Sequence, residues 1–169
     1  IDAQRVSTIL TNNRVNSVVS NYATDSRVKS ITNDPTACQY ITKELQLENA
    51  ATSIKIVLSG HTNPDANIRA FYAVGNDPGF EPIFTPFPGY SNLNSRGEII
   101  TAQNSDGLSD SLVTPSSQYG FGDNAAFKEY TFTADTLPSF RYYRIKLLLT
   151  STSQVFVPKV KDLRVMALA

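Results

Sequence analysis

The residues that could do chemistry in this chain are few and far apart. A hydrolytic triad needs a base beside its nucleophile, and His61, the one histidine, stands beside an expected turn in a sequence with no Gly-x-Ser-x-Gly elbow. Cys38 is the one cysteine, so an internal disulfide is excluded, and a single His with a single Cys makes no zinc ligand set. We predict no catalytic or metal role for either residue. We expect Cys38 to be a small, buried residue that behaves as an apolar side chain.

Carboxylates are the other candidates for acid–base catalysis, because a glycosidase can be built from two of them. Four lie in or beside expected strands: Glu44, Glu48, Glu129 and Asp135. Their spacing singles out no pair, and exposed acids on a β-surface explain them equally well. We therefore predict a protein that is not an enzyme and that carries no cofactor.

The stretch AQNSDGLSD, residues 102–110, partly matches a calcium-binding loop. Counted from Ala102, suitable residues take the third, fifth, sixth and ninth places: Asn104, Asp106, Gly107 and Asp110. Ala102 and Val113 stand where the first and last carboxylates belong. Too few oxygens remain for tight calcium binding, so the favoured interpretation is a polar turn shaped by Asp-Gly, with no metal ligand.

Aromatic side chains gather between Asn76 and Asn124, in a segment that is also rich in proline and glycine. So long an insertion in a compact domain is typical of a functional or interaction surface, and its rings argue against plain disorder. Rings that stack on sugar faces are one alternative, although the chain has no tryptophan; the other is that the rings roof one end of the core. The candidate binding residues are Tyr90, Tyr119 and Phe121.

The elements that must position these residues are β-strands, because apolar residues recur with a period of two. The alternation predicts strands over residues 52–60, 67–74 and 140–152, with shorter ones over 39–47 and 127–134. The Asn-Pro-Asp turn after residue 60 predicts an antiparallel hairpin between the first two. Bulk on both faces near Leu148 predicts a central strand covered on both sides.

The last residues, 157–169, predict a paired terminal strand with one apolar face: Leu163, Val165 and Ala167. The 169 residues fit a single domain, and the chain starts with Ile instead of Met. We therefore expect residues 1–169 to be the C-terminal module of a longer polypeptide, with residues 1–35 as an extended N-terminal arm.

The charge balance argues against two classes of partner, and the pattern of apolar residues predicts the fold class. Fifteen basic and fifteen acidic residues cancel without forming blocks, which argues against a nucleic-acid or anionic-membrane partner. The pattern as a whole predicts an all-β fold, an antiparallel β-sandwich of jelly-roll type with a loop-rich insertion at about residues 76–124.

Two blocks, residues 12–74 and 127–169, carry a resemblance to a known group of proteins. In order along the chain, the motifs are CQYITK, ATSIKI with its Pro-Asp turn, NIRAFY, PFPGY, EYTF and VPKVKDLRVMALA. This series resembles the C-terminal region of large virion structural proteins of tailed marine phages, especially those of the cyanophage type. Proteins of this type carry a fuller acid-and-glycine loop than NSDGLSD, so the resemblance implies no metal here.

The resemblance implies a non-enzymatic component of a phage particle, located in the tail, baseplate or fibre-attachment region. It implies contacts with other virion proteins, as a symmetric homo-oligomer or in many copies, and no catalytic residues. The alternative is a receptor-binding module of a tail fibre or baseplate that binds host-surface glycan through Tyr90, Tyr119 and Phe121.

Overall fold

The computed structural model describes residues 22, 24–36, 38–61, 66–88, 127–151 and 158–169. Predictions for Tyr90, Tyr119, Phe121 and the loop of residues 102–110 lie outside these residues. Within them the fold is all-β, as predicted, and the one helical element is the single 3-10 turn η1 (Ser26–Lys29). The described residues include no helix that is long and apolar enough to span a membrane.

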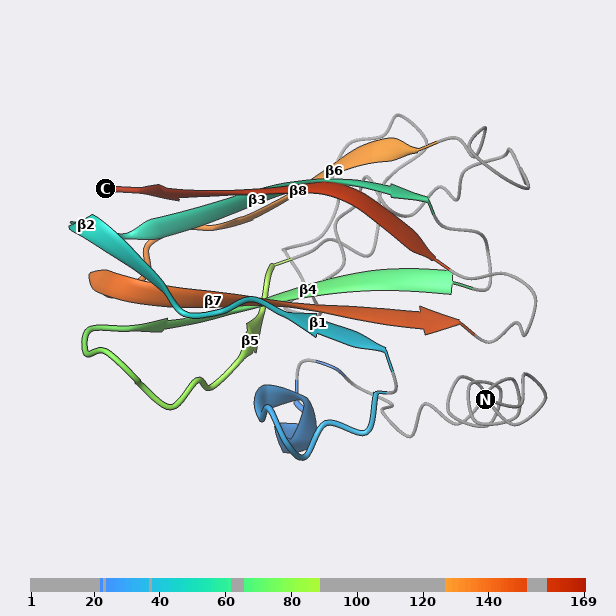
Figure 1. Cartoon of the computed structure of the whole chain (residues 1–169), viewed down its shortest axis with the longest axis horizontal. Coiled ribbons are helices and arrows are strands. Elements are labelled where there is room, and N and C mark those ends of the chain that lie inside the picture. The colour runs from blue at the N-terminus through green and yellow to red at the C-terminus, as the bar shows by residue number, and fades with distance from the viewer. Residues whose placement is uncertain (1–21, 23, 37, 62–65, 89–126, 152–157) are drawn as a thin grey trace.

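Two antiparallel sheets pack face to face (Figure 1). Sheet A is built on the central strand β7 (Phe140–Ser151), which pairs on one side with β1 (Gln39–Ile41) and β2 (Leu45–Ala51). On its other side β7 pairs with β4 (Ala66–Gly75), which in turn pairs with β5 (Thr85–Pro86). In sheet B, β3 (Ser53–His61) lies between β6 (Lys128–Ala134) and β8 (Lys159–Leu168).

The main core lies between the sheets and is formed by alternate residues of each strand. Ile54, Ile56 and Leu58 of β3 are fully buried there. They share this core with Ile145 and Leu147 of β7 and with the rings of Phe87, Tyr130, Phe132 and Phe140. Each fully buried aliphatic side chain of this kind contributes about 1.5–3 kcal/mol, and the predicted alternation of apolar residues is confirmed for these strands.

A second core covers the opposite face of sheet A. Phe71 of β4 and Leu148 of β7 are fully buried there, under Val28 and Phe84 from segments outside the sheet. The segment of residues 24–36, which includes η1, and the segment of residues 80–84 both contribute to this layer (Figure 1). The central strand is therefore covered on both faces near Leu148, as predicted.

A buried ion pair lies in this second core. Lys146 of β7 is completely buried, and its Nζ lies 2.5 Å from Asp34 Oδ2. The same ammonium donates to the carbonyl oxygens of Val28 at 2.8 Å and of Ser30 at 3.1 Å. Burial lowers the pKa of Lys146, while the Asp34 carboxylate opposes that shift. The ion pair fastens residues 28–34 to sheet A.

One predicted pairing is wrong. Strands β3 and β4 do not form a hairpin, because they belong to different sheets: β4 pairs with β7 from Ala66↔Ser151 to Gly75↔Tyr142, and β3 pairs with β6 and β8. Each strand has an apolar face that must be buried. Placing them in opposite sheets brings those faces together across the core, whereas a hairpin would put them side by side.

The expected strand over residues 39–47 is divided into β1 and β2. Thr42 lies at the break, where its amide donates to the carbonyl oxygen of Ile145 and its Oγ1 accepts from the Ile145 amide, both at 2.9 Å. The Glu44 carboxylate accepts the Gly79 amide at 3.0 and 3.1 Å. At this break a side-chain oxygen, Thr42 Oγ1, replaces a ladder acceptor for the Ile145 amide.

The terminal strand β8 is paired along β3, as predicted, and contains a bulge. Lys161 is opposite Ser59 and Arg164 is opposite Val57, so Asp162 and Leu163 together oppose Leu58. Asp162 takes a positive φ of 55°. Because of this extra residue, Val160, upstream of the bulge, packs on the same core as Leu163, Val165 and Ala167 downstream of it.

We expect loss of the Asp34 carboxylate to destabilise the chain strongly, although Asp34→Asn hardly changes the size of the side chain. Asp34→Asn leaves the Lys146 ammonium buried without a counter-charge, which should lower the free energy of unfolding by about 3–5 kcal/mol, and the double variant Asp34→Asn/Lys146→Met should recover most of that loss. Urea unfolding measures both. The control is Arg164→Met, which breaks an exposed ion pair and should cost less than about 1 kcal/mol. Equal losses in Asp34→Asn and the control would contradict the structural role of the pair.

The bulge gives a second prediction. Asp162→Gly should change the free energy of unfolding by less than about 0.5 kcal/mol, since glycine adopts positive φ without strain. Asp162→Val should lower it by about 1–2 kcal/mol, because a β-branched residue resists that conformation. Urea unfolding again measures the effect, with Thr131→Val on regular strand β6 as the control. A tolerated valine at residue 162 would show that the bulge is not required.

Candidate functional site

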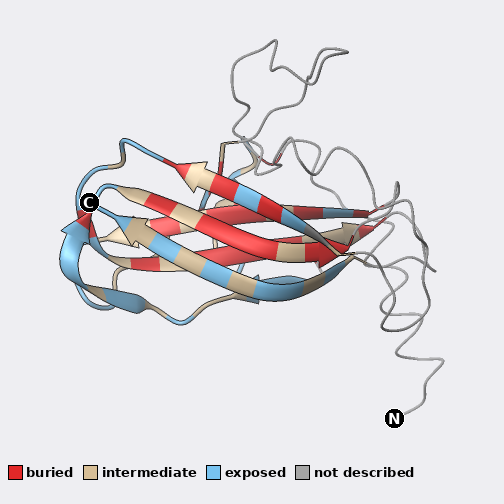
Figure 2. Cartoon of the chain, turned by 90° about the horizontal axis from the view of Figure 1, so that it is seen from above, coloured by how far each residue is buried: buried red, intermediate tan, exposed pale blue. Residues whose placement is uncertain are grey.

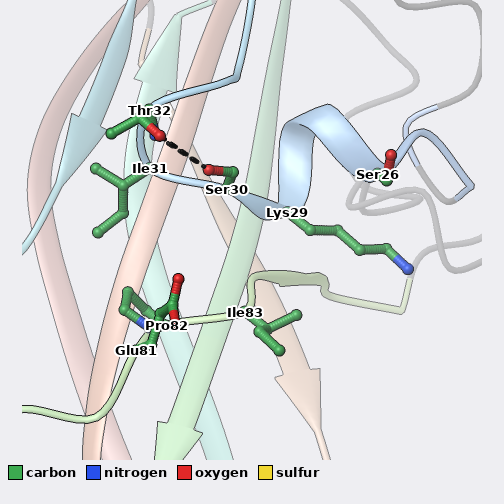
Figure 3. A pocket seen from close by; sticks show the side chains of 8 residues that line it. All are labelled: Ser26, Lys29, Ser30, Ile31, Thr32, Glu81, Pro82 and Ile83. Carbon is green, nitrogen blue, oxygen red and sulfur yellow. Dashed lines mark hydrogen bonds between the residues drawn. The ribbon is translucent and has the colours of Figure 1, made fainter.

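An open groove of about 490 Å³ lies on the layer that covers sheet A (Figure 3). One wall is η1 with the residues after it, and the other is the segment of residues 81–83. The Phe84 amide donates to the Lys29 carbonyl oxygen at 2.9 Å and joins the two walls. The side chains that line the groove are Ser26, Lys29, Ser30, Ile31, Thr32, Glu81, Pro82 and Ile83.

The apolar part of the groove is exposed: Ile83 keeps 69% and Ile31 keeps 38% of its surface in contact with solvent. The Ser30 and Thr32 hydroxyls lie 3.3 Å apart and hydrogen-bond each other, and Ser30 Oγ also accepts the Thr32 amide. None of the lining residues is a histidine or cysteine that could serve as a base or thiol nucleophile. The exposed isoleucines allow the groove to contact an apolar side chain.

Local charges hold the wall of the groove in place. Asp25 caps η1, accepting the Arg27 amide at 2.9 Å, and its carboxylate also pairs with the Arg27 guanidinium. These hydrogen bonds from Arg27 lower the pKa of Asp25 to about 2. The carboxylate is therefore ionised at neutral pH and already engaged with its neighbour.

A second surface is the outer face of sheet B, the face turned away from the core. It comprises alternate residues of β3 with their neighbours on β6 and β8. They are Ser53, Lys55, Val57, Ser59 and His61 of β3; Glu129, Thr131 and Thr133 of β6; and Lys159, Lys161, Arg164, Met166 and Leu168 of β8. Seen from this side, β8 alternates between intermediate and exposed residues (Figure 2).

Two further aromatic residues of the insertion, Phe84 and Phe87, lie in the two cores. Phe84 is fully buried in the layer over sheet A, and Phe87 is fully buried between the sheets. The ring of Phe87 meets the ring of Tyr72 edge-on, with centroids 5.0 Å apart. For these two rings the packing alternative holds, while Tyr90, Tyr119 and Phe121 stay predictions.

His61 and Cys38 lie in different sheets. His61 is buried at the end of β3, with its ring centroid 6.1 Å from that of Phe127. Cys38 is exposed, so the prediction of a buried cysteine is wrong. It precedes edge strand β1, where its carbonyl oxygen accepts the Leu149 amide at 3.0 Å and its thiol remains accessible. Among the residues with described positions, no group of three or more His, Cys, Asp or Glu could hold a metal ion.

The four candidate carboxylates are spread over both sheets. Glu44 lies 3.7 Å from Arg144 in sheet A, and Glu129 lies 3.0 Å from Arg164 in sheet B. Glu48 and Asp135 are exposed. The carboxylate that sequence reasoning missed is Asp34, and the available signal was Lys146, a lysine inside the apolar run of residues 145–149 that requires a buried partner.

The chain matches no known family model, no curated protein and no solved structure. Its function must therefore be inferred from its own residues and their arrangement.

Proposed function

We propose that the chain is a non-enzymatic structural protein of a phage virion, in the tail, baseplate or fibre-attachment region. It acts in particle assembly through contacts with other virion proteins, as a symmetric homo-oligomer or in many copies. The basis is the ordered series of motifs shared with the C-terminal region of virion structural proteins of tailed marine phages.

One observation carries the proposal: most motifs of the resemblance lie in strands, and these strands belong to both sheets. CQYITK includes β1, NIRAFY lies in β4, EYTF in β6, and the final motif includes β8. The motif ATSIKI runs into β3, the central strand of sheet B. A likeness carried by strands concerns the architecture, and the structural role is proposed by analogy with the virion proteins that the series resembles.

The order of the strands supports the jelly-roll form of the sandwich. Strands β2, β3 and β4 belong to sheets A, B and A in turn, and β6, β7 and β8 to sheets B, A and B. Consecutive strands of a double-sheet jelly roll alternate between the sheets in this way. The same alternation explains why β3 and β4 do not pair.

Two ion pairs in the described residues join segments of the chain. Asp34 with Lys146 fastens residues 28–34 to sheet A, and Glu129 with Arg164 links the two edge strands of sheet B across β3. Exposed apolar side chains offer contact surface instead: Tyr40 is 52%, Leu168 51% and Ile83 69% exposed. Many copies fixed by particle symmetry would make such contacts add up even where each is weak.

The composition of purified particles tests this proposal. Quantitative mass spectrometry of particles of the phage that encodes the chain should find its peptides in a fixed ratio to the other tail proteins. Absence of the chain from the particles would overturn the proposal.

A glycan array with the isolated chain tests the receptor-binding alternative. Selective binding that is lost in a Tyr90→Ala/Tyr119→Ala/Phe121→Ala variant, but kept in a Tyr40→Ala control, would favour glycan recognition over assembly as the main role.

A further inference from the structure

The two sheets differ in what lies over their outer faces. Residues 24–36 and 80–84 cover sheet A and bury Phe71 and Leu148. Phe127 lies against His61 and Lys161 at one end of the outer face of sheet B. No other described segment covers this face, and at its other end Met166 is 41% and Leu168 51% exposed. Figure 2 looks onto this open face.

The open face carries an excess of positive charge in a chain whose total charge is zero. Its cations are Lys55, Lys159, Lys161 and Arg164, against the carboxylates of Glu129 and, at the bulge, Asp162. Arg164 is neutralised by Glu129 at 3.0 Å, both side chains remaining about two-thirds exposed. Among the described residues, Lys55 and Lys161 have no carboxylate partner; Lys161 lies over the ring of Phe127 instead.

The lysines and the exposed apolar residues occupy neighbouring positions. Lys55, in the centre of the sheet, is directly opposite Met166 on β8 and Thr133 on β6. Val57, in the next row, is only 8% exposed, although it faces outward between Thr131 and Arg164. Methionine is enriched in protein–protein interfaces. A polyanion alone would make no apolar contact with Met166 and Leu168.

We propose that the outer face of sheet B is a docking surface for an acidic protein surface. Carboxylates of the partner pair with Lys55 and Lys161, and apolar groups of the partner contact Met166 and Leu168. A second copy presenting the same face is disfavoured, because it would set lysine against lysine. The inference rests on the proposed function in one respect: the partner is taken to be another virion protein.

The size of the face fixes the kind of contact. Three strands about 4.8 Å apart and about eight residues long, at about 3.3 Å each, give roughly 400 Å². That is about half of the roughly 800 Å² that each partner buries in an interface of standard size. A single contact is therefore weak and salt-sensitive, and repeated copies in a particle strengthen it.

Lysine reactivity in intact particles tests the surface. Acetylation of Lys55 and Lys161, read by mass spectrometry, should be at least about tenfold slower in the particle than in the free chain, while Lys43 on the far side serves as the reference. A carbodiimide, which joins amines only to carboxylates in direct contact, should link Lys55 or Lys161 to Asp or Glu of a different virion protein. Links to a second copy of this chain would overturn the inference, as would unchanged reactivity. If the chain is present in the particle and both lysines react freely, the docking surface fails while the proposed function stands.

The free chain allows a test that does not depend on the particle. Poly-L-glutamate should bind in about 50 mM NaCl and be released in about 500 mM. Lys55→Glu/Lys161→Glu should weaken binding at least about fivefold, whereas Lys43→Glu/Arg141→Glu, the same charge change on sheet A, should leave it within about twofold. Equal losses in the two variants would overturn the assignment of the face. Tighter binding of heparin with the same dependence on Lys55 and Lys161 would overturn the protein partner in favour of an anionic glycan.

Discussion

The fold depends on one constraint: β7 is buried on both faces, and one of its buried residues is a lysine. Lys146 cannot be left in an apolar layer as an unpaired charge, because that would cost several kcal/mol. The chain meets this requirement with Asp34 and with the carbonyl oxygens of Val28 and Ser30. These contacts hold the layer over sheet A in the position that brings Asp34, Val28 and Ser30 to the ammonium.

The groove follows from that position of the layer. Its walls, residues 26–32 and 81–83, are far apart in the sequence and meet because both pack on the second core, where Phe84 lies 5.2 Å from the Lys146 ammonium. No local pattern in the sequence could predict their meeting. The lysine in the run IKLLL indicates that a partner exists, but nothing near it indicates that the partner is Asp34, because the contact spans more than a hundred residues.

The period-two alternation predicted which residues of each strand face the core, but it did not predict which strand pairs beside it. The core-facing residues of β3, β4, β7 and β8 could all be read from the sequence, since burial requires alternation. The β3–β4 hairpin could not be judged in this way, because alternation looks the same whether the next strand pairs alongside or crosses to the opposite sheet. Cys38 shows the same limit: its small size favours burial, but its position before an edge strand exposes it.

The two outer faces differ in how much apolar surface a covering segment can bury on them. Covering sheet A requires ordering residues 24–36, which costs backbone entropy, and the covering layer buries Phe71, Phe84, Val28 and Leu148. The outward residues of sheet B are mostly threonine, serine and lysine, which solvate well and give a covering segment little to bury. Apart from Phe127 at one end, no described segment covers that face. An open face of that composition is suited to a partner that supplies charge, whereas a hydrophobic partner would gain only Met166 and Leu168 at one end.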